Sequence, residues 1–429
     1  MTPEVKKRIE QIRQGIVPEG YKKTESGIIP NEWRVGQVSK CIEEYKFFSN
    51  DISHIPVYSS SRKGLVPQSD YYNQREAVET NLGYKVVPQG YVTYRHMSDD
   101  DVFHFNINKT GENVLVSSEY PVFTSSDNCD LSFLISVLNN TARFRYFCKM
   151  QKLGGTRTRL YLDNLKRYAL ALPPFDEQKK IAEILATQDK AIELQARKIE
   201  ELKRFKKGCL EKMFPRKGQK VPEKRFPGFT DNWEQRKLSE MCGTFEYGLN
   251  AAAKEFDGKN KYIRITDIDD ASREFLLSDL SSPDICLDGM SKYLLSSGDI
   301  IFARTGASVG KTYIYRENDG IVYFAGFLIR AKVNQDNDAE FVFQSTLSPS
   351  YEKYIRITSQ RSGQPGVNAQ EYGEYDLFAP SKEEQQRIGH FLRGIDNLIT
   401  LHQRKLEEMK NQKKALMQLL LTGIVRVRL

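Results

Sequence analysis

The amino-acid sequence predicts an α+β fold: two α/β domains with β-rich cores are separated by two long helices, and the chain carries a pseudo-two-fold internal repeat. Three observations support this prediction. The 429 residues exceed what one hydrophobic core usually serves, which indicates several domains. A segment of the first half recurs in the second half. Each half also joins short alternating runs of apolar residues to one long stretch of heptad periodicity.

The repeat is clearest in two charged segments that lie 207 positions apart. Residues 197–203 read RKIEELK and residues 404–410 read RKLEEMK, so every charge is kept and every apolar position stays apolar. At the same offset, both halves contain a proline followed by a Glu-Gln pair: Pro173, Glu177 and Gln178, and Pro380, Glu384 and Gln385. The only two tryptophans, Trp33 and Trp233, open the two halves.

The repeat divides the chain into six segments. They are an N-terminal segment (1–33), a first variable domain (34–171), a central long helix (172–217), a linker (218–233), a second variable domain (234–378) and a C-terminal long helix (379–429). Both variable domains are rich in Tyr, Phe, Val and Ile in short runs broken by Gly, Asn and Asp, which is typical of strands and turns. We expect strands within 85–95, 113–124, 299–303, 311–316 and 321–333, and a helical stretch late in each domain, at 131–151 and 339–357.

The two long helices, expected over 177–217 and 382–428, each carry a narrow apolar stripe. Heptad steps from Ile181 and from Ile388 meet mostly apolar residues over about five heptads, as a coiled coil requires. The stripe residues are Ile181, Leu185, Ile192, Ile199 and Leu202 in the first helix, and Ile388, Leu392, Ile399, Leu406 and Met409 in the second. Because a pseudo-two-fold sets equivalent helices antiparallel, we expect an intramolecular antiparallel coiled coil; pairing between chains is the alternative.

Composition narrows the class of protein. No apolar run approaches the 18 residues that a membrane-spanning helix needs, so we expect a cytoplasmic protein without membrane contact. The six cysteines are scattered and the five histidines show no ligand spacing, which predicts neither a metal site nor a disulfide framework. A formal charge of +8 is compatible with a nucleic-acid partner.

The charge is unevenly distributed along the chain. Each long helix has a net charge of +5, the first variable domain +3 and the second −6. Basic residues between 143 and 167, including Arg143, Arg145, Arg157 and Arg159, surround the single acid Asp163 and could bind phosphates. A basic helix face followed by a surface loop is the alternative interpretation.

Two motifs resemble catalytic ones without meeting their requirements. The loop from Gly306 to Thr312 has three residues between its glycines where a phosphate-binding loop needs four, so we expect a tight turn between two strands. Leu172-Pro173-Pro174-Phe175 resembles the tetrapeptide of adenine N6-methyltransferases, but Leu replaces the Asn or Asp that would accept the hydrogen bond. We therefore expect no catalytic and no cofactor-binding residue in this chain.

The order of motifs in the two halves resembles the specificity (S) subunit of type I restriction-modification systems over about residues 20–429. The motifs are RFPGF at 225–229, the pair Trp233-Glu234, GDIIF at 298–302 with Arg304-Thr305-Gly306, GQPGV at 363–367, and the repeated Pro and Glu-Gln before each long helix. The first variable domain departs from this pattern, because Gly90-Tyr91-Val92 lacks the Asp and 156–160 (TRTRL) lacks the Gln-Pro.

The resemblance implies that each variable domain is a target-recognition domain for one half of a bipartite double-stranded DNA target. The long helices would act as a spacer and bind two methyltransferase subunits, and restriction and translocase subunits would join the complex. The chain itself would be a non-catalytic subunit, with S-adenosylmethionine, ATP and Mg²⁺ bound by its partners.

Base recognition needs Arg, Lys, Asn, Gln or Ser side chains on exposed loops. We expect DNA contacts from Ser60, Arg62, Lys63, Arg143, Arg145, Arg157, Arg159, Arg304, Lys311, Arg356, Gln360, Arg361 and Gln364. Two alternatives stay open: a coiled-coil interaction scaffold without a DNA role, and a nucleotide-binding enzyme that uses the loop from Gly306 to Thr312.

Overall fold

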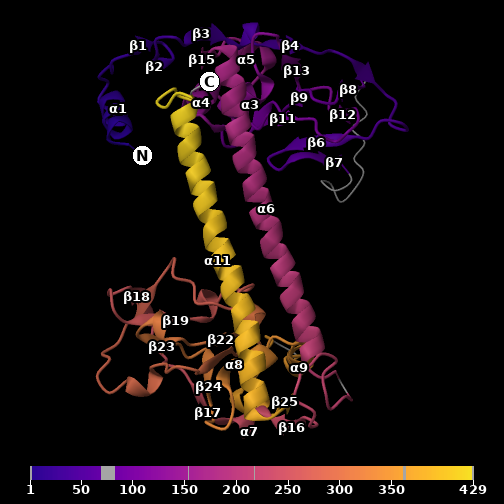
Figure 1. Cartoon of the computed structure of the whole chain (residues 1–429), viewed down its shortest axis with the longest axis vertical. Coiled ribbons are helices and arrows are strands. Elements are labelled where there is room, and N and C mark those ends of the chain that lie inside the picture. The colour runs from indigo at the N-terminus through magenta and orange to yellow at the C-terminus, as the bar shows by residue number, and fades with distance from the viewer. Residues whose placement is uncertain (1, 69–82, 153, 217, 361–363, 428–429) are drawn as a thin grey trace. The chain divides into compact units, whose positions relative to one another are not determined.

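A computed structural model describes residues 2–68, 83–152, 154–216, 218–360 and 364–427 (Figure 1). The chain forms two compact units: unit 1 comprises residues 1–193 and 407–429, and unit 2 comprises residues 194–406. Within the described ranges, no helix has the length and apolar character to cross a membrane.

Unit 1 is built from short strands and helices around one aromatic core. Its helices are α1 (Pro3–Arg13), α3 (Leu131–Asn140), α4 (Ala142–Lys149), α5 (Leu162–Lys166) and the first part of α6 (Phe175–Met213), with a 3-10 turn, η1 (Val38–Lys40). Its strands are β1 (Tyr21–Thr24), β2 (Gly27–Pro30), β3 (Arg34–Gln37), β4 (Ile42–Glu44), β5 (Phe48–Ser49), β6 (Tyr58–Ser61), β7 (Gly64–Pro67), β8 (Tyr84–Val87), β9 (Val92–Thr93), β10 (Met97–Ser98), β11 (Asn106–Ile107), β12 (Val114–Val116), β13 (Val122–Ser125), β14 (Thr158–Arg159) and β15 (Ala169–Leu172). The rings of Phe105, Phe123, Phe144 and Tyr168 contact one another in the core.

Unit 2 follows a similar plan. Its helices are α7 (Leu238–Met241), α8 (Ala339–Ser345), α9 (Pro349–Thr358), α10 (Ala369–Gly373) and the first part of α11 (Lys382–Leu420), with 3-10 turns η2 (Ile265–Asp267), η3 (Ser291–Tyr293), η4 (Gly306–Ser308) and η5 (Glu317–Asp319). Its strands are β16 (Glu234–Lys237), β17 (Cys242–Tyr247), β18 (Ala253–Glu255), β19 (Lys261–Ile263), β20 (Ser281–Pro283), β21 (Ile300–Ala303), β22 (Thr312–Ile314), β23 (Val322–Phe324), β24 (Leu328–Val333) and β25 (Asp376–Ala379).

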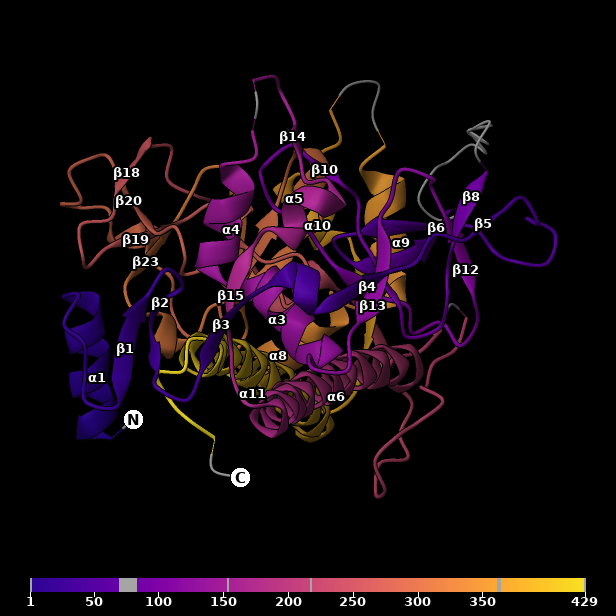
Figure 2. The same ribbon diagram turned by 90° about the horizontal axis from the view of Figure 1, so that it is seen from above.

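The central sheets of the two units have the same topology. Unit 1 contains a four-stranded sheet in the order β11-β9-β13-β4, and unit 2 contains one in the order β22-β21-β24-β17. The register agrees as well, because Thr93 pairs with Val122 and Ile301 pairs with Arg330, both 208 positions later. In each unit the strand that opens the variable domain pairs with the strand that closes it, β3 with β15 and β16 with β25. Both domains are therefore closed at their base by a two-stranded ribbon, which for unit 1 can be followed in Figure 2.

The Glu-Gln pair joins each domain to its long helix through buried hydrogen bonds. In unit 1, the Gln178 side chain donates to the Pro173 carbonyl and accepts from the Asp130 amide at the start of α3. In unit 2, Gln385 makes the same contacts with Pro380 and with the Asp338 amide at the start of α8. The spacing between the proline and the Glu-Gln pair, which is the same in both halves of the chain, therefore determines where each long helix begins relative to its domain.

The preceding Glu side chains are also buried and each binds one arginine through two hydrogen bonds. Glu384 accepts from Nε and Nη2 of Arg225, both at 2.7 Å. Glu177 accepts from Arg426 at 2.7 and 2.8 Å and also from the indole of Trp33 at 3.1 Å. The linker in unit 2 and the C-terminal tail in unit 1 thus have the same role at the two helix starts.

The C-terminal tail packs on the N-terminal segment within unit 1. Arg8 donates to the Ile424 carbonyl at 2.7 Å, and the Tyr21 hydroxyl donates to the Gly423 carbonyl at 2.8 Å. Gly423 has φ of 71°, and a Cβ there would lie 2.6 Å from Cδ of Pro30, so only glycine fits this close approach.

The expected strands are found, although most are shorter than predicted, and two helical predictions were wrong in detail. The stretch 131–151 is two helices, because Thr141 has extended backbone (ψ 135°) and its side chain caps α4. The stretch 339–357 is also two helices, since Ser348 caps α9 and Pro349 begins it. The long helices end earlier than expected, α6 at Met213 before Pro215 and α11 at Leu420.

Candidate nucleic-acid interface

Two pairs of loops occupy equivalent positions at the ends of the central sheets. In unit 1, residues 96–98 follow β9 and lie against residues 158–160: the Leu160 amide donates to the His96 carbonyl at 2.8 Å, and β10 pairs with β14. In unit 2, residues 304–305 follow β21 and lie against residues 366–367: the Val367 amide donates to the Arg304 carbonyl at 2.9 Å. We call these arrangements junction 1 (residues 96–98 and 157–160) and junction 2 (residues 304–305 and 364–367).

Junction 1 presents cationic and aromatic side chains together. Arg157 and Arg159 are exposed, and Nε of Arg157 donates to Asp99 at 2.8 Å. The ring of His96 stacks on Tyr161, with centroids 5.5 Å apart and an interplanar angle of 26°. Tyr161 is 51% exposed, so part of this aromatic ring is open to solvent two residues after Arg159.

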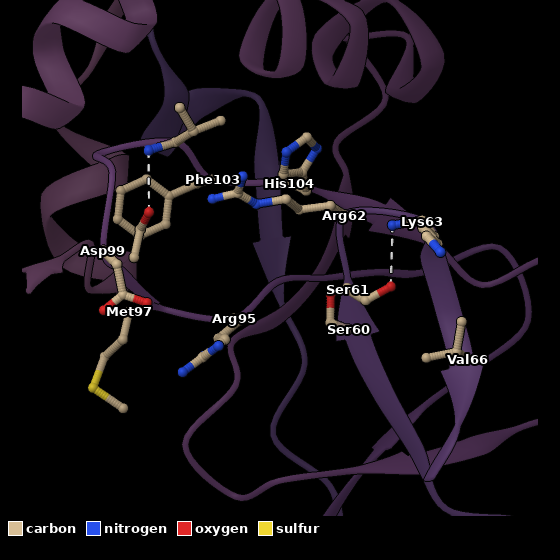
Figure 3. A pocket seen from close by; sticks show the side chains of 12 residues that line it. Ser60, Ser61, Arg62, Lys63, Val66, Arg95, Met97, Asp99, Phe103 and His104 are labelled. Carbon is tan, nitrogen blue, oxygen red and sulfur yellow. Dashed lines mark hydrogen bonds between the residues drawn. The ribbon is translucent and has the colours of Figure 1, made fainter. Parts of the chain in front are cut away.

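A cavity of about 500 Å³ adjoins junction 1 (Figure 3). Its lining comes from the β6–β7 hairpin and from the segments around β10, and comprises Ser60, Ser61, Arg62, Lys63, Val66, Arg95, Met97, Ser98, Asp99, Val102, Phe103 and His104. Arg62 forms an ion pair with Asp100 at 2.6 Å, and Lys63 is exposed at the hairpin turn. Arg62, Lys63 and Arg95 carry three positive charges, which are opposed by the carboxylates of Asp99 and of Asp100, the partner of Arg62. The cavity wall therefore keeps a net positive charge and suits a polyanion.

Ser60 has a different place from the one we expected. Its side chain is buried, accepts a hydrogen bond from Asn106 at 2.8 Å and donates to the Thr93 carbonyl at 3.5 Å. It therefore supports the hairpin that carries Arg62 and Lys63, and we no longer expect it to contact DNA directly.

The acidic run at 99–101 is accounted for by local contacts. Asp99 binds Arg157, Asp100 binds Arg62, and Asp101 accepts from the Thr158 hydroxyl. Asp99 and Asp100 thus hold Arg157 and Arg62 in place, and Asp101 holds the strand residue between Arg157 and Arg159.

Burial lowers the pKa of His96 and of His104 below the ordinary histidine value, so both favour the neutral form in the folded state. The unfolded chain binds protons first as the pH falls through about 6.5, so the stability of unit 1 should decrease below that pH. Replacing His96 with Gln should flatten this dependence in urea unfolding followed between pH 5 and 8. The exposed His390→Gln variant is the control, and an equal flattening by both variants would contradict the assignment.

Junction 2 combines a guanidinium, an amide and an aromatic ring. The guanidinium of Arg304 lies over the Tyr247 ring, 5.0 Å from its centroid, in the geometry of a cation–π contact. Gln364 is exposed, and its amide nitrogen lies 3.2 Å from where a Cβ of Gly306 would be. A hydrogen bond from the Gly306 amide to the Pro365 carbonyl at 3.0 Å holds the two segments together.

Lys311 does not belong to this surface. Its side chain is only 7% exposed, donates to the Ile268 carbonyl at 3.0 Å and forms an ion pair with Asp270 at 2.6 Å. The loop from Gly306 to Thr312 is the tight connection between antiparallel strands β21 and β22 that the sequence predicted. Because the Lys311 ammonium is already bound within the protein, it is not available to DNA or to the phosphates of a nucleotide. The expectation of a DNA contact from Lys311 was therefore wrong.

Four of the remaining predicted residues lie on helix α4, on helix α9 or just after α9. Arg143 and Arg145 are exposed on α4, and Arg145 is near enough to His104 to contribute to its lowered pKa. Arg356 is exposed on α9 and Gln360 just after it, while Arg361 lies outside the described residues. The structure therefore brings together Arg157 with Arg159, Arg62 with Lys63, and Arg304 with Gln364.

The candidate residues chosen from the sequence did not include three aromatic or imidazole groups at the junctions, His96, Tyr161 and Tyr247. The signal that could have revealed His96 is the 208-residue offset of the sheets, which aligns His96 with Arg304, and Leu160 with Val367 to within one residue. The differences at 90–92 and 156–160 concealed this alignment.

The apolar stripes of the long helices are buried within each unit to different degrees. Ile181, Leu185, Ile199, Ile388, Leu392 and Ile399 are buried, whereas Ile192, Leu202, Leu406 and Met409 are half-buried. In unit 2 the helices contact each other through Lys206 and Asp396, 2.6 Å apart, and through Gln195, which donates to the His402 carbonyl at 2.9 Å. In unit 1 the equivalent ion pair joins Lys413 to Asp189. The two helices thus run antiparallel where they meet in unit 2, because higher numbers in α6 face lower numbers in α11.

The sequence of the chain matches a known protein family. The sequence model of the type I restriction modification DNA specificity domain matches residues 35–204 and 230–411. The chain therefore belongs to this family, with one family domain in each half of the repeat.

Individual relatives agree with this assignment. The chain is 27% identical over 277 residues to the type I restriction enzyme MjaVIII specificity subunit of Methanocaldococcus jannaschii, an alignment that covers 62% of this chain and 63% of that one. It is 22% identical to the putative MjaX specificity subunit of the same organism, over 96% of this chain and 97% of that one. The aligned part thus spans less than two thirds of the first relative and nearly the whole of the second.

Solved structures show the same fold at lower identity. The S subunit of a type I restriction-modification system from M. genitalium has a TM-score of 0.55 at 14% identity, covering 92% of this chain and 96% of that one. A chain from a structural study of complex assembly and conformational transition of the type I R-M system has a TM-score of 0.53 at 13% identity, covering 92% and 99%.

Proposed function

We propose that this chain is the specificity subunit of a type I restriction-modification complex and that each junction reads one half of a bipartite DNA target. The observation that carries the proposal is the pair of equivalent junctions. Each junction lies at the end of the four-stranded sheet of its own unit and presents side chains that can bind base edges. Membership of the specificity-domain family supports it.

The side chains at the two junctions differ, which predicts an asymmetric target. Arg157 and Arg159 at junction 1 suit guanine, whose O6 and N7 accept two hydrogen bonds from a guanidinium. Gln364 at junction 2 suits adenine through N6 and N7, and Arg304 beside it suits guanine. Because equivalent positions carry unlike groups, the two half-sites should have unlike sequences.

The long helices would form an intramolecular antiparallel coiled coil that sets the spacing of the half-sites and binds two methyltransferase subunits. Support comes from the antiparallel contact in unit 2 and from the pseudo-equivalent ion pairs Lys206–Asp396 and Lys413–Asp189. The half-buried positions Ile192, Leu202, Leu406 and Met409 would leave apolar surface for the partner subunits.

This chain would contribute recognition and no catalysis. Methyltransferase subunits would bind S-adenosylmethionine, and restriction and translocase subunits would bind ATP and Mg²⁺. The complex would act in the cytoplasm, on DNA.

DNA binding tests the proposal directly. Selection of duplexes from a random library by the full chain should return two short constant sequences separated by a fixed unread spacer. Binding should weaken steeply between 50 and 200 mM salt, because phosphate contacts release counterions. Retention of duplexes without any common sequence would contradict the proposal.

Lengthening both helices by one heptad beside Gln195 and beside His402 should lengthen the unread spacer. Seven residues add about 10.5 Å to a helix and keep the apolar stripe in register. At 3.4 Å per base pair this corresponds to at most about three base pairs. The selected half-sites themselves should not change. A four-residue insertion at the same places is the comparison, because it rotates the stripe; an unchanged spacer in the heptad variant would contradict a role as a ruler.

A further inference from the structure

The side chain of Phe327 is exposed to solvent at the edge of junction 2. It lies between β23 and β24, two strands that are labelled in Figure 1. Its side chain is 61% exposed. Its carbonyl accepts a hydrogen bond from the Arg304 amide at 3.1 Å, so the residue is adjacent to the proposed guanine-reading arginine. The exposed ring therefore belongs to the same surface as Arg304, Tyr247 and Gln364.

The turn that carries Phe327 is fixed by its neighbours. The Leu328 amide donates to the Ala325 carbonyl at 2.8 Å, and the Leu249 amide donates to the Phe324 carbonyl at 2.8 Å. Gly248 lies against the turn so closely that a Cβ there would be 2.2 Å from the Ala325 oxygen. These contacts fix the backbone of the turn and so hold the Cα of Phe327 beside Arg304.

The equivalent turn in unit 1 has the same backbone hydrogen bond but carries a different type of side chain. The Tyr120 amide donates to the Ser117 carbonyl at 3.0 Å, as Leu328 does to Ala325, and these residues are 208 positions apart. At this offset Phe327 corresponds to Glu119, which is exposed. The backbone is thus repeated while the side chain changes from an aromatic ring to a carboxylate, as expected at a position that distinguishes two sequences.

We propose that Phe327 reads a thymine in the half-site bound by unit 2, by covering the C5-methyl group of that base. This inference rests on the proposed DNA-recognition function. The ring of Phe327 has no hydrogen-bonding group, and the C5-methyl of thymine is the apolar group that base edges present in the major groove. The guanidinium of Arg304 and the amide of Gln364 fix the neighbouring bases, so the ring meets a defined position.

The test replaces single thymines by deoxyuridine in the duplex that the full chain selects. Uracil keeps every hydrogen-bonding group of thymine and lacks only the methyl. Loss of one buried methyl contact should weaken binding about fourfold at one thymine of the unit 2 half-site. The Phe327→Ala variant should bind the thymine and uracil duplexes equally, and Phe327→Leu should retain most of the preference. Leu277→Ala removes another side chain of unit 2 that is 60% exposed and should change nothing.

The outcomes separate this inference from the proposed function. If the wild-type chain selects no common sequence, the proposed function fails. If it selects a split sequence but every thymine in the unit 2 half-site tolerates uracil, or if Phe327→Ala keeps the full thymine preference, only the role of Phe327 is overturned. Equal weakening of all duplexes by Phe327→Ala, with the thymine preference intact, would likewise overturn it and would indicate insertion of the ring between bases.

Discussion

Exchanging residues 34–171 for the corresponding domain of another specificity subunit should change one half of the methylated motif and leave the other half and the spacer intact. The domain is closed at its base by the β3–β15 pair and contacts its long helix through Gln178 and Asp130, so it can be replaced as a unit. Specific binding usually exceeds non-specific binding by about 10³-fold or more, so methylation at the original motif should be lost. Sequencing of methylated sites checks this result.

The reciprocal exchange of residues 234–378 is the matched control. It should change only the other half of the motif, because its own base is the β16–β25 pair. Alteration of both halves by either exchange would contradict the independence of the two junctions.

Replacing Arg225 with Met should lower the free energy of unfolding by about 3 kcal/mol, because it leaves the Glu384 carboxylate buried without a charged partner. The side chain of Glu384 is fully buried and that of Arg225 is 15% exposed. Urea unfolding measures the loss.

Arg426→Met provides a matched comparison in unit 1. The effect should be smaller there, because Arg426 is 32% exposed and the indole of Trp33 still donates to Glu177. In unit 2 the Trp233 indole nitrogen has no hydrogen-bond partner among the described residues, so it cannot compensate for Arg225. Equal losses in both variants, or no loss in Arg225→Met, would contradict this account of the helix starts.

Much of the architecture could be predicted from the sequence because repetition and periodicity are local signals. The heptad stripes from Ile181 and Ile388 identified the two long helices, and the Glu-Gln pairs indicated where they begin. The breaks at Thr141 and Ser348 were missed because a capping residue between two apolar helical segments leaves the hydrophobic pattern uninterrupted.

The site was harder to predict than the fold because exposure and pairing depend on the tertiary structure. Arg304 directly follows strand β21 and Lys311 directly precedes strand β22, yet Lys311 is buried against Asp270 and Arg304 is half-buried over Tyr247. His96 and Tyr161 are 65 positions apart and meet only because β10 pairs with β14. Likewise, nothing in the local sequence of Phe327 indicates that its turn repeats the one at Glu119.

The central claim is that this chain determines which DNA sequence is methylated. A genome-wide map of N6-methyladenine in the source organism, with the gene intact and with the gene deleted, tests this claim most directly. The account predicts that deletion removes methylation from one split motif with two unlike halves and leaves other motifs unchanged. A map that is unchanged by the deletion, with no split motif lost, would contradict it.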